Sequence, residues 1–124
     1  MNRLLSIIVM VLAYGIAVPA VASTMQNEIA HLLSYVENTS CQYERNGAMH
    51  SGEKAARHIN KKYDYFKDEI DSAEKFIELS ASKSTMSGKP YMIRCDGKGE
   101  MTSQAWLLQE LRDYRKAGLT GSGE

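Results

Sequence analysis

The chain has 124 residues, with 15 Lys and Arg side chains against 15 Asp and Glu side chains, and two cysteines. This balanced charge gives no general attraction to nucleic acid. A chain of this length forms one domain with a modest core and leaves no room for a second domain.

The first 22 residues have the pattern of a secretory signal peptide. A positively charged start precedes an almost wholly apolar run over residues 4–18, and Ala20-Val21-Ala22 matches the small-x-small cleavage rule. We therefore predict cleavage after Ala22, a periplasmic or secreted protein, and a mature single domain of residues 23–124 that stays off the membrane. The alternative is an uncleaved anchor, because the apolar segment is nearly long enough to span a bilayer.

The first part of the mature chain predicts one helix followed by a hairpin. Apolar side chains recur at helical spacing over residues 25–36, and Ser23 with Gln26 has the spacing of a capping box. Residues 41–45 alternate as a short strand does, and residues 48–50 form its partner. Between them lies Asn46-Gly47, the strongest two-residue signal for a tight hairpin turn.

The second part predicts helices near residues 52–68 and 72–81, because Asp71-Ser72-Ala73-Glu74 has the pattern of a new N-cap. A single kinked helix is the alternative. A Ser-rich loop follows, and then a strand up to Cys95. The sequence Asp-Gly-Lys-Gly over residues 96–99 reads as a turn. A last amphipathic helix begins at Thr102-Ser103 and is expected to end at Gly118, a typical glycine stop.

These elements predict an α+β domain, in which three to four helices pack on a small antiparallel sheet of two to three short strands. In an exported protein, Cys41 and Cys95 are expected to form one disulfide. Two free thiols or an intermolecular bond are the alternatives.

Common catalytic and metal-binding motifs are incomplete in this chain. Ser80-Ala81-Ser82-Lys83 matches S-x-x-K, but the other motifs of penicillin-recognising enzymes are missing. The glycine that opens a phosphate-binding loop is absent before Ser87-Gly88-Lys89-Pro90. Histidines 31, 50 and 58 lack the spacing of a zinc motif. We therefore expect no cofactor, no metal and no nucleic-acid partner.

Several short stretches, in their order and spacing, carry a resemblance to a known family. They are Arg45-Asn46-Gly47, Glu53-Lys54-Ala55 with His58, Ala73-Glu74-Lys75-Phe76-Ile77, Ala81-Ser82-Lys83-Ser84 with Ser87-Gly88-Lys89-Pro90-Tyr91, and Trp106-Leu107 with Glu110-Leu111. Together they resemble the YfeK-like family of small bacterial envelope proteins of unknown function. The resemblance implies a periplasmic protein, and it carries over no activity and no catalytic residues.

Polar residues gather around two turns that a Cys41–Cys95 bridge brings near each other. This candidate binding surface consists of Arg45, Asn46, His58, Ser84, Ser87, Gly88 and Lys89. A purely structural role of these residues, in turn geometry and loop hydrogen bonds, is the competing interpretation.

The absence of a complete catalytic set favours a non-enzymatic envelope protein that binds another protein or a small ligand. One alternative is a small hydrolase or metal-dependent enzyme that uses His58 or the loop from Ser80 to Lys89. Another is a structural or stress-related periplasmic protein without a discrete site.

Overall fold

The computed structural model describes residue 15 and residues 24–121. The predicted signal peptide, its cleavage site and the anchor alternative lie outside the described residues. Within the described part of the chain, no helix is both long enough and apolar enough to cross a membrane.

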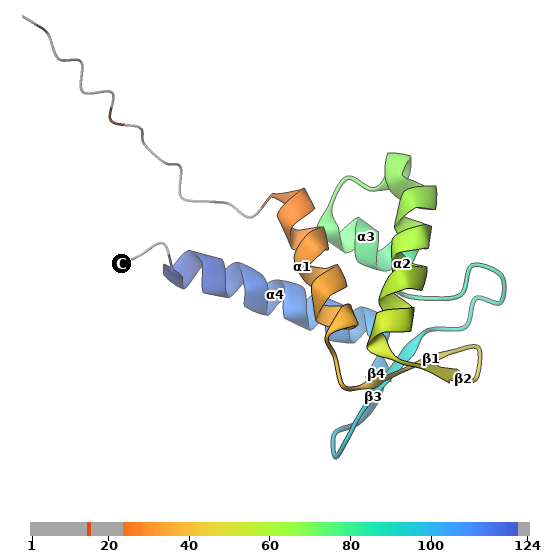
Figure 1. Ribbon diagram of the computed structural model, residues 1–124. Helices are drawn as coiled ribbons and strands as arrows, with labels where there is room; N and C mark the ends of the chain where they lie inside the picture. Colours follow the sequence, from red (N-terminus) through yellow and green to blue (C-terminus); the bar gives the residue numbers. More distant parts are fainter. Residues whose placement is uncertain (1–14, 16–23, 122–124) are drawn as a thin grey trace, which may run out of the picture.

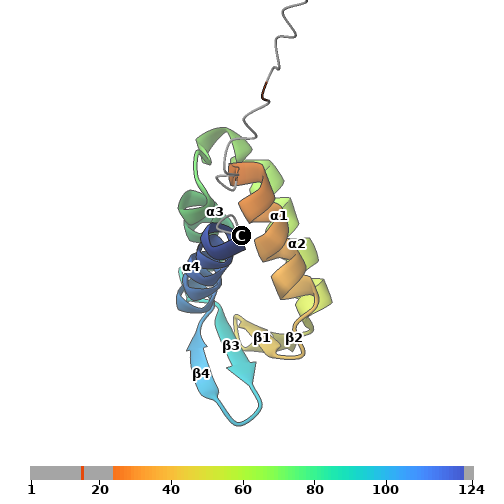
Figure 2. The same ribbon diagram turned by 90° about the vertical axis from the view of Figure 1, so that its left-hand side faces the viewer.

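The fold is α+β, as predicted, with a group of helices above a twisted antiparallel sheet (Figures 1 and 2). The helices are α1 (Met25–Glu37), α2 (Gly52–Phe66), α3 (Ala73–Ser80) and α4 (Ser103–Gly121), with a short 3₁₀ turn at Lys67–Glu69. The strands are β1 (Gln42–Arg45), β2 (Ala48–His50), β3 (Met92–Cys95) and β4 (Gly99–Thr102).

The sheet has four strands in the order β2-β1-β3-β4, rather than the two to three that we predicted. The missed strand is β4, because the expected turn at residues 96–99 is tighter than its composition indicated. Gly97 and Gly99 both adopt positive φ, so the chain reverses within three residues and Gly99 already pairs with Cys95.

The region between residues 52 and 81 forms two helices, so the prediction of a break is confirmed and a single kinked helix is wrong. After the 3₁₀ turn, Ile70 is extended, and Ser72 caps α3 by accepting a hydrogen bond from the Lys75 amide. Ser51 caps α2 in the same way.

The ends of α1 and α4 bear on two further predictions. Thr24 caps α1 through a hydrogen bond from the Asn27 amide, while Ser23 of the predicted capping box lies outside the described residues. Helix α4 continues through Gly118 to Gly121. Gly118 is not among the glycines with positive φ, so the left-handed geometry of a glycine stop is absent there.

A single core lies between the helices and the upper face of the sheet, and Ile77, Ile93 and Leu107 are fully buried in it. Tyr43 reaches from β1 to the start of α4, where its hydroxyl forms a hydrogen bond with the buried Ser103 hydroxyl. At Gly52 the first turn of α2 lies directly on the end of α1. An added Cβ would come within 2.2 Å of the Val36 carbonyl oxygen, so this approach requires glycine.

The Cys41–Cys95 disulfide is present, as predicted. It joins the residue before β1 to the last residue of β3, two strands that pair side by side. The bond closes a loop across a sequence separation of 54 that contains β2, α2 and α3.

A second tertiary link joins three helices through one guanidinium group. Arg115 on α4 donates two hydrogen bonds to Glu28 on α1, at 2.6 and 3.0 Å, and two to Glu74 on α3, at 3.2 and 2.8 Å. The side chain of Glu28 is only 7% exposed. These contacts lower the pKa of Glu74 and keep Arg115 charged.

Replacing both cysteines by serine is expected to reduce the free energy of unfolding by about 4 kcal/mol, because the unfolded chain without the bridge has a higher conformational entropy. Chemical denaturation of oxidised and Cys41→Ser/Cys95→Ser proteins measures this difference. A loss below about 1 kcal/mol would show that the bridge does not constrain the unfolded chain.

Replacing Arg115 by Gln is expected to cost about 2 kcal/mol, because the nearly buried Glu28 carboxylate loses its charged donor. Arg57→Gln is the matched control, since Arg57 forms only an exposed pair with Glu53 on the same helix. Denaturation curves of the two variants should differ clearly, and equal curves would refute the role of Arg115.

Candidate functional site

The tip of the β1–β2 hairpin lies against the loop between α3 and β3. Asn46 donates from Nδ2 to Ser84 Oγ at 3.4 Å and accepts at Oδ1 from Ser87 Oγ at 2.7 Å. Asn46 and Gly47 both have positive φ, as a tight Asn-Gly turn requires. This contact, which joins segments about 40 residues apart in sequence, is called the hairpin–loop contact below.

The loop is closed mainly by its own hydrogen bonds. The amide of Ser84 donates to the Lys89 carbonyl, the Gly88 amide donates to the Ser84 carbonyl, and the Ser87 amide donates to Ser84 Oγ. Ser84 is buried, and Gly88 has a positive φ. The serines and the glycine predicted for the site therefore support loop geometry, which agrees with the structural interpretation of these residues.

Beside this contact, the hydroxyl of the buried Tyr91 is shared by two basic side chains of α2. Lys62 Nζ donates to Tyr91 Oη at 3.2 Å and to the Lys83 carbonyl at 2.7 Å, and it lies 5.1 Å from the centroid of the Tyr91 ring. His58 Nε2 lies 3.3 Å from the same Oη. A lysine ammonium can only donate, so Lys62 donates to Tyr91 Oη. If His58 is neutral, its Nε2 accepts a hydrogen bond from the Tyr91 hydroxyl, and Lys62, Tyr91 and His58 are all satisfied.

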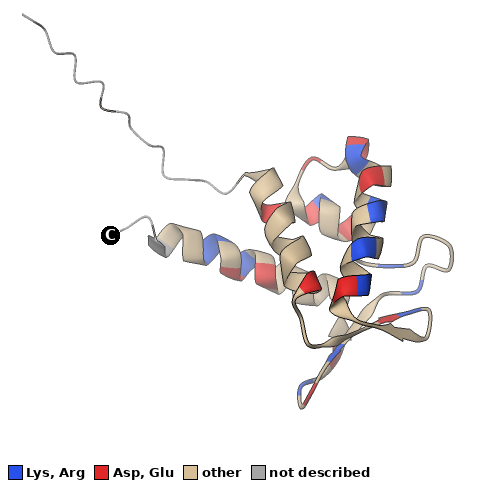
Figure 3. Ribbon diagram, in the orientation of Figure 1, with Lys and Arg blue, Asp and Glu red and all other residues tan. Residues whose placement is uncertain are grey.

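Arg45 on β1 and His50 on β2 complete the group, which we call the basic cluster: Arg45, His50, His58 and Lys62 around Tyr91. Arg45, His50, His58 and Tyr91 line a common cavity of about 10 Å³, which is room for one water molecule at most. Figure 3 shows basic residues on α2, on the hairpin and on the neighbouring loop on this side of the molecule.

Burial and neighbouring positive charges lower the pKa values of three bases in the cluster. Burial and the charges of Arg45 and Lys62 lower the pKa of His58 to about 4. Burial and Arg45 also lower the pKa values of His50 and Lys62. Among the described residues, no carboxylate forms an ion pair with Arg45 or Lys62.

The structure thus divides the predicted surface into two adjoining parts. Asn46, Ser84, Ser87 and Gly88 form the hairpin–loop contact and its turn, while Arg45 and His58 belong to the basic cluster. The backbone of Lys89 closes the loop, and its side chain is exposed.

Sequence reasoning missed three members of the cluster, His50, Lys62 and Tyr91. His58 and Lys62 are spaced i, i+4, which places both on one face of α2. The sequence carried that signal. The approach of Tyr91 depends on the loop connection and carries no local signal.

The structure does not bring His58 within hydrogen-bond reach of Ser84 or Ser87, the contact that the hydrolase alternative predicts. His58 contacts Tyr91, and no hydrogen bond connects its ring with Ser84 or Ser87. The Ser84 hydroxyl oxygen instead accepts from Asn46 and from the Ser87 amide. Neither serine is therefore activated by this histidine.

Comparisons with known proteins agree with the resemblance noted in the sequence. A family model described as a family of unknown function, DUF5329, matches residues 23–115. The chain is also 34% identical over 89 residues to the uncharacterized protein YfeK of Salmonella typhimurium. The aligned segment covers 68% of this chain and 74% of that protein. No solved structure gives a significant match. The chain therefore belongs to the DUF5329 family, whose function is unknown and which includes proteins similar to YfeK.

Proposed function

We propose that this protein is a non-enzymatic component of the bacterial envelope that binds an anionic group of a small ligand or of another protein at the basic cluster. Support for the envelope comes from the signal-peptide pattern and from the resemblance to the YfeK-like family. Support for anion binding comes from one observation, the convergence of Arg45, His50, His58 and Lys62 without a carboxylate partner in the described chain.

Burial is the main cause of the lowered pKa values of His50, His58 and Lys62, and the repulsion between neighbouring positive charges lowers them further. A bound anion removes that repulsion, so part of the folded protein's unfavourable electrostatic energy becomes binding energy. Perturbed groups that converge in one place are typical of functional sites for this reason.

The donors at the cluster suit a small oxyanion. A guanidinium such as that of Arg45 can donate two parallel hydrogen bonds to a phosphate, sulfate or carboxylate group. Lys62 adds a point charge, and a protonated His58 adds a third donor. Because the internal cavity holds one water at most, the anion must lie on the outer side of the cluster. An anionic group that is part of a larger molecule can also bind there.

The double variant Arg45→Gln/Lys62→Gln is expected to bind sulfate at least about tenfold more weakly than the native protein, since it loses two charged donors. Chemical-shift titration of labelled protein with sulfate measures this, and a parallel titration with acetate tests whether carboxylates bind as well. The matched control is Arg57→Gln/Lys67→Gln, which removes two exposed charges from α2 and from the 3₁₀ turn. Equal weakening in both double variants would refute the site and indicate a general charge effect.

Sulfate affinity is expected to increase as the pH falls from 7 toward 4. In the free protein, His58 is neutral above its pKa of about 4. A bound anion stabilises the imidazolium and raises this pKa, so binding takes up a proton between the free and bound values. Isothermal titration calorimetry across this range measures the slope, and sulfate itself keeps a constant charge.

The comparison variant for this pH test is His58→Gln, which retains a hydrogen-bonding side chain but cannot titrate. Its sulfate affinity should rise less steeply as the pH falls. If the native protein and the variant show the same slope, His58 does not take part in anion binding.

A further inference from the structure

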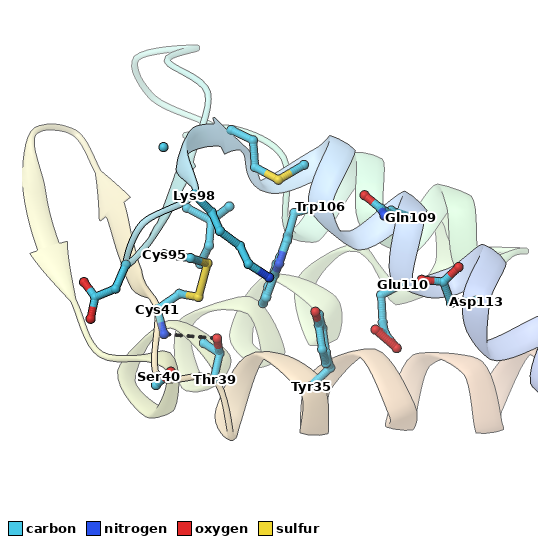
Figure 4. A pocket seen from close by; sticks show the side chains of 14 residues that line it. Tyr35, Thr39, Ser40, Cys41, Cys95, Lys98, Trp106, Gln109, Glu110 and Asp113 are labelled. Atoms are coloured by element: carbon cyan, nitrogen blue, oxygen red, sulfur yellow. Dashed lines mark hydrogen bonds between the residues drawn. A yellow bond between two sulfur atoms is a disulfide. The ribbon is translucent and has the colours of Figure 1, made fainter.

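A larger cavity, of about 480 Å³, opens beside the disulfide between α1, α4 and the β3–β4 hairpin (Figure 4). Its volume lies within the range of small-molecule sites. The basic cluster does not contribute to its lining. Tyr35 comes from α1, Trp106, Glu110 and Asp113 from α4, and the Cys41–Cys95 bridge forms part of the wall.

One wall of this cavity is a stack of aromatic rings. The Tyr35 and Trp106 rings stack with centroids 4.5 Å apart at an angle of 29°, and the Tyr43 ring meets Trp106 edge-on at 6.2 Å. Behind Tyr35, His31 stacks on Tyr114 at 4.1 Å. These contacts hold both rings in place, so the wall offers a preformed apolar surface for the body of a ligand.

The charged side chains that line this cavity are mainly acidic. Glu110, Asp113 and Asp96 line the cavity together with only one base, Lys98. Glu110 contacts His31 Nε2 at 3.3 Å, which orients its carboxylate. The pKa of Tyr35 is raised first by burial and then by the charges of Glu110 and Asp113, so these carboxylates act on the aromatic wall itself. Aromatic faces and carboxylates both favour a cation.

The protein itself places an amine at this cavity. Figure 4 shows the Lys98 side chain extending from the β3–β4 turn across the cavity toward Trp106. Lys98 is exposed and, within the described residues, forms no ion pair with a carboxylate. Its ammonium group therefore stands where a ligand amine would be attracted, and it is able to swing out toward solvent.

From these contacts we infer that the cavity is a second binding site, specific for a small organic cation that carries a primary amine on an apolar or aromatic body. The apolar part lies against Tyr35 and Trp106, and the amine lies near Glu110 and Asp113, where the positive charge of Lys98 in the same cavity competes with it. The site differs from the basic cluster in both location and charge, and it does not depend on anion binding there.

The test uses phenethylamine as the probe and 2-phenylethanol as its neutral counterpart of similar shape, with the shift of the Trp106 indole N–H followed by NMR. Phenethylamine is expected to bind at least about tenfold more tightly than 2-phenylethanol, since only the amine gains the charge contacts. Equal affinity, or no shift of Trp106 with phenethylamine at millimolar concentration, would overturn the proposal.

Substitutions that remove negative charges from the cavity and one that removes its positive charge should change amine binding in opposite directions. Glu110→Gln and Asp113→Asn should each weaken phenethylamine binding several-fold, while Lys98→Gln should strengthen it by removing the competing ammonium. Glu78→Gln is the matched control, because Glu78 is an exposed carboxylate on α3 that pairs with Lys75. Weakening by Glu78→Gln equal to that by the cavity variants, or weaker binding by Lys98→Gln, would refute the site.

Thermal melting of each variant separates a binding effect from a folding effect. Asp113 forms no ion pair or hydrogen bond with another described side chain in the structure, so Asp113→Asn is expected to melt close to the native temperature. Loss of amine binding in that variant, with unchanged melting, supports the proposal. Unchanged binding in folded Asp113→Asn and Glu110→Gln proteins overturns it.

Discussion

The Cys41–Cys95 disulfide is the constraint on which the arrangement of the domain depends. It fixes the start of β1 to the end of β3, and the chain between these ends must then form β2, α2, α3 and the loop before β3 within a closed circuit. Tyr43 and Ile93, which pair across the two strands, are both buried beneath the helices. The disulfide itself lines the large cavity, and Tyr43 lines the small cavity of the basic cluster.

Hydrogen bonds from neighbouring segments hold the residues of the basic cluster in place. The hairpin–loop contact holds Arg45 near the loop, and Lys62 is tied to both the Lys83 carbonyl and the Tyr91 hydroxyl. Burial, followed by the charges of Arg45 and Lys62, lowers the pKa of His58 and keeps its imidazole neutral at pH 7. Anion binding at the cluster, as proposed above, would offset the cost of keeping these bases together.

The two proposed sites, the basic cluster and the large cavity, are lined by charges of opposite sign. Both the basic cluster and the large cavity are formed by residues within 23–115, the segment that matches the DUF5329 family model. The same positions can therefore be compared in similar proteins, such as the uncharacterized protein YfeK of Salmonella typhimurium.

The sequence by itself determined the features that depend on neighbouring residues. Asn46-Gly47 predicted the hairpin, the N-cap pattern Asp71-Ser72-Ala73-Glu74 predicted the break between α2 and α3, and two cysteines in an export pattern predicted the disulfide. Arg45 and His58 could also be selected, because polar residues beside predicted turns are visible in the sequence. Only the tertiary structure showed that β4 begins directly after the Asp-Gly turn, that Tyr91 joins His58 with Lys62, and that Trp106 stacks on Tyr35 beside the disulfide. These contacts join segments far apart in the chain, and their geometry depends on how the helices pack on the sheet, which no local pattern encodes.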